Sequence, residues 1–285
     1  MIELGAVVLN TKHLQAQKNF YQHIIGLSVL KEDDNKVELG IKGNEEPLIT
    51  LVATNLPKGH YYGLYHLAIL VPSRKDLGDA LLHILKAQAP IQGASNHGYS
   101  EAIYLADLEG NGIEIYHDRP KSVWNYQGDK IIGITEEMDA ESVLALAEDK
   151  NPYFMPEGSK MGHVHLTVEN PLASQVFLKE MLDMDEKFSM RDQATWLANG
   201  DYHHHIAANK WAGALNKIHD INTPGLNHFV VKIQDETDWC RFVEATETHP
   251  EYIVNQSAKE YLIKDYNGIH ILVRQDYNKN ANVYI

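Results

Sequence analysis

The sequence predicts an α+β fold built from four copies of one unit, a strand followed by a helix and three further strands (βαβββ). Two observations indicate this repeat. Four short apolar segments with strand character are each followed by a segment with helical periodicity. One position of the first strand also recurs and is occupied by Ala6, His66, His163 and His228. We number these units modules one to four.

Modules one and two occupy the first part of the chain. Residues 5–9 and 65–69 are apolar and rich in β-branched or aromatic residues, which predicts their first strands. Residues 12–25 and 74–88 follow them with apolar positions spaced near 3.6 residues, which predicts helices. The spacing is clearest in the second helix, at Leu77, Leu81, Leu82 and Leu85.

Modules three and four repeat the pattern further along. Their first strands are predicted at 162–166 and 227–231, and their helices at 171–182 and 236–246. The helix of module three begins with Pro171, which fits a first helical turn because no partner is needed there for the missing N–H.

The spacing of the modules predicts two domains. Residues 1–118 form an N-terminal module pair and residues 161–285 form a C-terminal module pair. The connection at 119–160 is longer than the others and is read as a linker, with one predicted helix at 140–147.

Composition narrows the classes of function. The chain of 285 residues carries 39 acidic and 25 basic side chains, a formal net charge of -14, so nucleic acids and anionic membrane surfaces are not expected partners. No apolar run approaches the ~20 residues that span a bilayer, and the first residues lack a secretion signal. We therefore expect a cytoplasmic protein. The single cysteine, Cys240, excludes an internal disulfide and a CxxC zinc site.

Two residues interrupt apolar strands in module two. Glu114 stands between Ile113 and Ile115, and His66 stands within the first strand of the module. A carboxylate among core-type residues is costly unless it is paired or bound to a metal. Two such residues on the first and last strands of one module can point into the same concave sheet. They would offer one nitrogen and one oxygen ligand.

The segment 97–114 carries a recognisable pattern. It resembles the signature of the type I extradiol ring-cleavage dioxygenases of the vicinal oxygen chelate superfamily. Leu108 replaces the proline of that signature and Ser95 departs from its strict form, but neither departure removes a reactive group. The wider similarity to catechol 2,3-dioxygenase-like proteins covers 65–120 and 161–213. The matching residues are His97, Ile103, Tyr104, Asp107, Gly110 and Glu114.

The resemblance implies a role for each matched side chain. A ferrous iron, or manganese(II) as a substitute, would be held by two histidines and one carboxylate, which leaves open positions for reactants. His205, in a His-x-x-Ala strand, is implied as the acid–base residue, while His97 and Tyr104 would hydrogen-bond the substrate or oxygen. The implied metal ligands are His66, Glu114 and His163.

The order of the modules leaves three pairings to consider. Pairing modules one and two gives only His66 and Glu114, because Ala6 stands where a ligand would be expected in module one. In the family, modules three and four usually contribute the metal ligands, and here they would supply His163, His228 and His270, with His270 standing where the glutamate is expected. That set contains no carboxylate. Pairing modules two and three gives both histidines and Glu114. We therefore expect modules two and three to face each other across the active site.

The implied activity is insertion of O2 into a catechol-type ring next to its vicinal hydroxyls. The partners would be a small aromatic substrate and O2, and a homo-oligomer is compatible with the sequence. Two alternatives share the fold: a glyoxalase-like metal-dependent isomerase or lyase, and a non-catalytic drug-sequestering protein. Trp196 and Trp211 are candidates for a pocket wall, although core packing is favoured for both.

Overall fold

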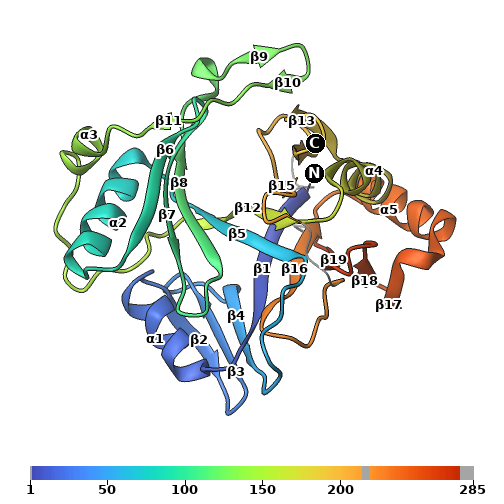
Figure 1. Cartoon of the computed structure of the whole chain (residues 1–285), viewed down its shortest axis with the longest axis horizontal. Coiled ribbons are helices and arrows are strands. Elements are labelled where there is room, and N and C mark those ends of the chain that lie inside the picture. Colours follow the sequence, from blue (N-terminus) through green and yellow to red (C-terminus); the bar gives the residue numbers. More distant parts are fainter. Residues whose placement is uncertain (1, 214–217, 277–285) are drawn as a thin grey trace, which may run out of the picture.

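The computed structural model describes residues 2–213 and 218–276, and it contains the four predicted modules (Figure 1). The fold is α+β, as expected, and its strands form two large curled sheets. Module one consists of β1 (Ile2–Thr11), α1 (Leu14–His23), β2 (Ser28–Glu32), β3 (Lys36–Gly40) and β4 (Pro47–Ala53). Module two consists of β5 (Gly63–Leu70), α2 (Arg74–Lys86), β6 (Ile91–Asn96), β7 (Ser100–Ala106) and β8 (Gly112–Asp118).

The second half of the chain has the same order of elements. Module three consists of β12 (Lys160–Thr167), α4 (Pro171–Leu182), β13 (Asp185–Ser189), β14 (Ala194–Ala198) and β15 (Ile206–Asn209). Module four consists of β16 (Gly225–Ile233), α5 (Glu236–Thr248), β17 (Ile253–Gln256), β18 (Glu260–Lys264) and β19 (His270–Gln275). The helix of module three has the predicted bounds. Helices α2 and α5 begin at the predicted residues, and the other helix ends differ from prediction by two residues.

The connection between modules two and three carries small elements. They are a short helical turn (Lys121–Val123), β9 (Tyr126–Gln127), β10 (Lys130–Ile131), β11 (Glu136–Glu137) and α3 (Ala140–Leu144). Strands β9 and β10 form a two-stranded ribbon, and β11 adds to the edge of the sheet beside β6. The predicted helix at 140–147 is therefore present but shorter.

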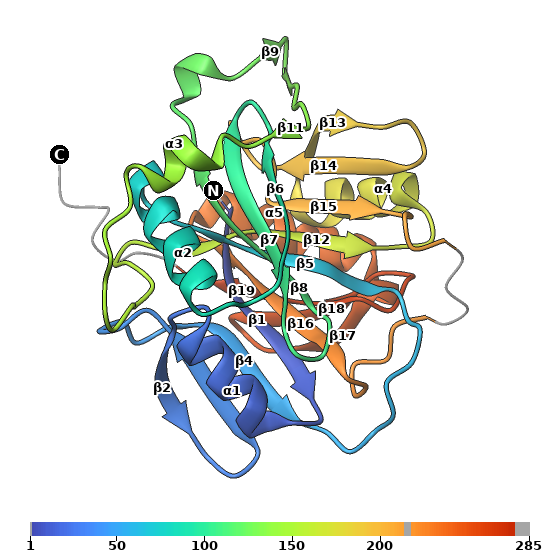
Figure 2. The same cartoon turned by 60° about the vertical axis from the view of Figure 1, so that its left-hand side comes forward.

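Each sheet combines modules from the two halves of the chain. The eight-stranded sheet joins modules one and four through antiparallel β1 and β16, in the order β17-β18-β19-β16-β1-β4-β3-β2. The nine-stranded sheet joins modules two and three through antiparallel β5 and β12, in the order β11-β6-β7-β8-β5-β12-β15-β14-β13. Figure 2 shows β5 and β12 side by side across the middle of the molecule. The division into domains at 1–118, 119–160 and 161–285 stays a prediction.

Alternation along the strands separates two faces of each sheet. In β5, Leu67 and Ile69 belong to the main apolar core, which they share with Leu77 and other residues of α2. Ala68, the residue between them, points to the opposite face, where it packs with Tyr116. The helix therefore covers one face of the sheet, and a site can form on the other.

Helices α2, α4 and α5 begin at capping residues whose side chains accept hydrogen bonds from the first turn. The side chain of Ser73 accepts from the backbone N–H of Asp76 at the start of α2. Asn170 and Asp235 cap α4 and α5 in the same way. Such a cap contributes about 1 kcal/mol, which helps to fix where each helix starts relative to its sheet.

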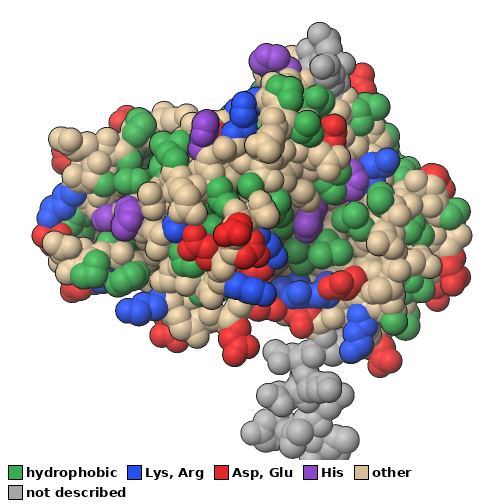
Figure 3. Space-filling view, turned by 90° about the horizontal axis from the view of Figure 1, so that it is seen from below, with side chains coloured by type: hydrophobic (Ala, Val, Ile, Leu, Met, Phe, Trp, Pro, Cys, Tyr) green, Lys and Arg blue, Asp and Glu red, His purple; other side chains and the backbone are tan. Residues whose placement is uncertain are grey.

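The surface carries both signs of charge. On the face shown in Figure 3, acidic and basic side chains lie next to one another across the middle. Among the described residues, no helix has both the length and the apolar character needed to cross a membrane.

Candidate active site

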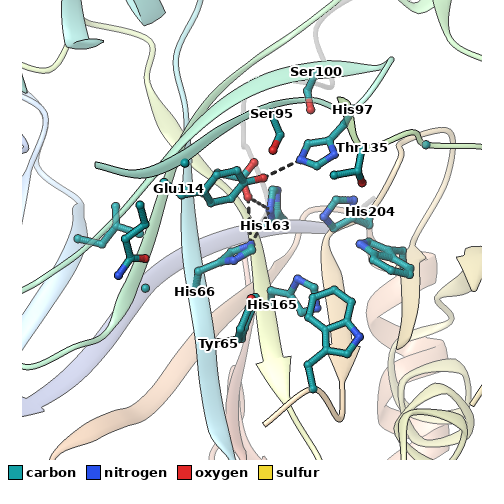
Figure 4. Close-up of a pocket in the computed structure, with 18 of the residues that line it drawn as sticks. Tyr65, His66, Ser95, His97, Ser100, Glu114, Thr135, His163, His165 and His204 are labelled. Carbon is teal, nitrogen blue, oxygen red and sulfur yellow. Dashed lines mark hydrogen bonds and ion pairs between the residues drawn. The ribbon is translucent and has the colours of Figure 1, made fainter. Parts of the chain in front are cut away.

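A cavity of about 740 Å³ lies on the nine-stranded sheet, on the face away from α2. Its walls come from β5, β7, β8 and β12, from the residues around Thr135, and from the 188–211 region of module three. Modules two and three therefore enclose it together. Figure 4 shows the side chains that point into it.

The structure brings His66, Glu114 and His163 together in this cavity (Figure 4). They come from three adjacent strands, because β5 lies between β8 and β12 in the sheet. Parallel pairing of β5 and β8 sets Ala68 beside Glu114, and antiparallel pairing of β5 and β12 sets Ala68 beside His163. The small side chain of Ala68 leaves room between them.

The three ligand-type atoms lie close enough to share one cation. The Nε2 atom of His66 is 3.0 Å from Oε2 of Glu114, and the Nε2 atom of His163 is 3.1 Å from the same oxygen. The two nitrogens are 3.4 Å apart. Ligands about 2.1 Å from one cation are separated by roughly 3.0–3.4 Å at octahedral or tetrahedral angles. The donor set therefore fits a divalent metal.

The protonation states also suit metal binding. Burial acts to raise the pKa of Glu114, but its contacts with His163 and His66 outweigh burial and hold the pKa well below its ordinary value. Burial lowers the pKa of His163 to about 4. Near neutral pH the site thus offers an ionised carboxylate and a neutral imidazole, the forms that bind metals.

His97 and Tyr104 lie together beside this cluster. Nε2 of His97 is 2.6 Å from the hydroxyl of Tyr104, and its Nδ1 is 3.0 Å from the carbonyl oxygen of Ile134. A carbonyl only accepts, so in the neutral ring Nδ1 donates to Ile134 and Nε2 accepts from Tyr104. Tyr104 lies directly opposite Glu114 in the β7–β8 ladder.

The three consecutive histidines before β15 divide between two environments. His204 lines the cavity, with its ring centroid 4.2 Å from that of His163. His205 is not among the lining residues, and its ring lies 5.1 Å from that of Tyr202. The structure therefore places His204, rather than the predicted His205, at the cavity.

A hydrogen-bond chain fixes the tautomer of His204. Nε2 of His203 donates to Oδ1 of Asp118 over 2.9 Å, because the carboxylate can only accept. Nδ1 of His203 then accepts from Nδ1 of His204 over 2.7 Å. This leaves a lone pair on Nε2 of His204, a nitrogen able to take a proton. The sequence reasoning missed both Asp118 and His203, which have no motif of their own.

The eight-stranded sheet holds no comparable cluster. Among the described residues, the only group of three or more metal-type ligands is the one in the nine-stranded sheet. In module two Ala68 pairs with Glu114, and in module four the equivalent residue, Val230, pairs with Leu272, which places Leu272 at the equivalent of Glu114. The expectation that His270 takes the glutamate position is therefore wrong by two residues.

Two βαβββ modules that enclose a cavity, with candidate metal ligands on adjacent strands, define the vicinal oxygen chelate class of protein. Residues 3–115 match the family described as the Glyoxalase/Bleomycin resistance protein/Dioxygenase superfamily. The chain is 34% identical over 270 residues to a catechol-2,3-dioxygenase of Bacillus subtilis (strain 168), which covers 92% of this chain and 93% of that protein. The chain belongs to this superfamily, and the likeness supports an enzyme.

Solved structures agree on the fold. A putative dioxygenase from Bacillus subtilis superposes with a TM-score of 0.64 at 14% identity, over 96% of this chain and 84% of that one. Glyoxalase I from Zea mays superposes with a TM-score of 0.57 at 13% identity, over 96% and 92% of the two chains. At these identities the similarity concerns the fold alone.

Proposed function

We propose that the chain is a metal-dependent extradiol dioxygenase that inserts O2 into a catechol-type ring. The observation that carries this proposal is the convergence of His66, Glu114 and His163 beside the His97–Tyr104 pair in one cavity. The similarity to a protein named catechol-2,3-dioxygenase supports the same reaction class. In that reaction both oxygen atoms enter the product, and one ring C–C bond next to the two hydroxyls breaks.

His66, His163 and Glu114 are the residues that would hold the metal, with ferrous iron preferred and manganese(II) as a substitute. Two neutral imidazoles and one carboxylate leave a divalent ion with one net positive charge and with open positions. A bound ferrous ion would supply a Lewis acid that lowers the pKa of the catechol hydroxyls, together with the redox chemistry that O2 requires.

The chain's own residues would move the protons. His204 presents a lone pair on Nε2 to the cavity, so it is placed to accept a substrate proton and to return it later. Asp118 and His203 hold that tautomer. We assign the acid–base role to His204 in place of His205.

The His97–Tyr104 pair would orient the substrate. The hydroxyl of Tyr104 is engaged by His97 at 2.6 Å, and its oxygen retains a lone pair for a catechol hydroxyl. The pair stands on the side of the cavity formed by β7, so it would fix the direction in which the ring enters. Holding both reactants in a set orientation removes much of the entropic barrier.

Anaerobic reconstitution with ferrous iron, followed by catechol and air, tests this proposal. A yellow ring-opened product and stoichiometric O2 consumption are expected from the loaded protein and not from the metal-free control. Turnover of a thiohemiacetal with zinc, without ring opening, would instead identify a glyoxalase-like enzyme. Binding of an aromatic compound with no turnover under either condition would identify a sequestering protein and contradict the proposal.

A further inference from the structure

We propose that the preferred substrate is an uncharged catechol with an apolar, ring-sized substituent, and that carboxylated catechols are excluded. This inference rests on the proposed function and concerns the cavity beyond the metal ligands. The substituent would lie along four side chains that we call the aromatic wall: Tyr65, Phe188, Trp196 and Trp211.

The cavity is too large for an unsubstituted catechol. Its volume is about 740 Å³, whereas a cavity of roughly 150 Å³ accommodates a benzene ring. A catechol bound at His66, Glu114 and His163 would leave most of this space to water. A second ring attached to the first would fill a further part of it and displace that water.

The aromatic wall is continuous and begins at the candidate ligands. The ring of Tyr65 lies 5.3 Å from that of His66 and 5.5 Å from that of Trp211. Trp196 continues the wall at 6.3 Å from Trp211, and Phe188 lies 5.2 Å beyond, measured between ring centroids. Aromatic rings at these separations offer edges and faces to a further ring. A substituent can therefore extend from the metal position without leaving aromatic contact.

The mouth of the cavity exposes apolar surface that a substituent would cover. Tyr65 is 43% exposed, Trp211 is 46% exposed and Met190 is 49% exposed, although all three line the cavity. Large apolar side chains left in water at one concave site are typical of a ligand-binding surface. Burying them against an apolar group would contribute favourable free energy in proportion to the area covered.

No cation among the described lining residues can receive a carboxylate. The described lining side chains include neither lysine nor arginine, and their one acidic group is Glu114. Lys210, next to Trp211 in the chain, is paired with Asp192. A carboxylate taken from water without a partner is strongly disfavoured. The net charge of -14 adds a repulsive field for anions.

Neutral polar side chains also line the cavity. They are Gln92, Ser95 and Thr135. Their amide and hydroxyl groups can hydrogen-bond a hydroxyl or a carbonyl, but they cannot balance a full charge. Both the neutral polar groups and the aromatic wall therefore suit an uncharged ligand.

Equilibrium binding of three catechols to the ferrous protein without O2 tests the inference. The probes are 3-phenylcatechol, catechol and 3,4-dihydroxybenzoate, and the readouts are calorimetry and quenching of tryptophan fluorescence. We expect phenylcatechol to bind at least tenfold more tightly than catechol, and the carboxylated compound at least tenfold more weakly. Equal affinities for all three, or a preference for the carboxylated compound, would overturn the inference.

Variants of the wall locate the effect. Trp211→Ala should weaken phenylcatechol binding roughly tenfold and weaken catechol binding clearly less, so that the ratio of the two affinities falls. Trp211→Arg should raise the affinity for 3,4-dihydroxybenzoate, because it adds the missing cation. Phe154→Ala, which removes an exposed aromatic residue that does not line this cavity, is the matched control and should change neither value. Unchanged binding in both Trp211 variants would contradict the role of the wall.

A parallel assay in air separates this inference from the proposed function. Ring opening of all three compounds with equal kcat/KM and equal affinity would overturn the inference and leave the function intact. Selective binding of phenylcatechol with no ring opening of any compound would support the inference about the cavity and contradict the dioxygenase proposal.

Discussion

The two sheets of the molecule have the same construction but different chemistry. Each joins two modules through antiparallel first strands, β5 with β12 in one and β1 with β16 in the other. The positions that carry His66, Glu114 and His163 in the nine-stranded sheet carry His228, Leu272 and Ala6 in the eight-stranded sheet. The scaffold therefore does not need the ligand-type residues for folding. They occur together in only one of its two sheets.

A turn that both sheets share strengthens this comparison. Asp107 accepts hydrogen bonds from the backbone of Glu109 and Asn111 before β8. Asp265 accepts them from Asn267 and Ile269 before β19, with the same spacing. The aspartate turn within the 97–114 pattern therefore has a structural role that is common to both sheets. The last residue of the pattern, Glu114, distinguishes the site.

The largest effect is expected when the carboxylate is removed. Glu114→Gln keeps the size of the side chain but removes the negative charge, so it should lower iron affinity more than about 100-fold and abolish ring opening. Metal analysis after dialysis and an O2-uptake assay measure both. His228→Ala, the matched change in the other sheet, should keep full iron content. Iron lost from His228→Ala and kept by Glu114→Gln would reverse the comparison between the sheets.

The next largest effect separates two adjacent histidines. His204→Gln should lower kcat by about 10²- to 10³-fold with the metal retained, because it removes the group placed to transfer protons. His205→Gln should change kcat less than about threefold, since that ring lies outside the cavity lining. A larger loss in His205→Gln than in His204→Gln would restore the assignment made from the sequence.

A partly buried histidine of the eight-stranded sheet, His228, should affect stability. Burial, and then the neighbouring His270, lower the pKa of His228 to about 4, whereas in the unfolded chain it is about 6.5. As the pH falls between these values, only the unfolded chain takes up the proton, so the free energy of unfolding decreases. His228→Gln should remove about 2 kcal/mol of this loss, roughly thirtyfold in the unfolding equilibrium.

Urea unfolding of the metal-free protein at pH 7 and about pH 4.5 measures this difference. Between pH 7 and about pH 4.5 the free energy of unfolding should fall more for the parent than for His228→Gln, by about 2 kcal/mol. An equal fall for the parent and for His228→Gln would mean that His228 does not titrate as its environment in the folded protein indicates.

The smallest effect concerns a hydroxyl. The residue opposite Glu114 in its ladder is Tyr104, and the equivalent residue in module four is Leu262. Tyr104→Phe should lower kcat/KM about tenfold. It removes the hydrogen bond to His97 and the one proposed to the substrate. Tyr261→Phe in the other sheet is the control. Equal kcat/KM for the parent and Tyr104→Phe would exclude a role for the hydroxyl.

Local patterns in the sequence predict the modules and the three side chains that the structure brings together as candidate metal ligands. Apolar periodicity predicts the four helices. The combination of His66, Glu114 and His163 predicts that modules two and three face each other, and these modules do share one sheet. The errors concern registers of one or two residues. His205 and His270 lie beside the expected positions, because a motif match does not fix which face a residue occupies until the ladder is known.

Other features of the site depend on contacts between distant residues. The pairing of module one with module four joins strands far apart in the chain, and no local pattern encodes it. The hydrogen bond from His203 to Asp118 spans 85 positions and belongs to no motif. Trp196 and Trp211, for which core packing was favoured, line the cavity instead. Their apolar character alone favours a place in the core, and only the arrangement of the strands puts them at the cavity.

An anomalous-scattering map of crystals of the iron-loaded protein, grown without O2, is the most direct measurement. We expect one iron peak about 2–2.3 Å from Nε2 of His66, Nε2 of His163 and a carboxylate oxygen of Glu114, with no peak near His228. A peak at His228 and His270, or no iron in contact with Glu114, would contradict the assignment of the metal site to the nine-stranded sheet.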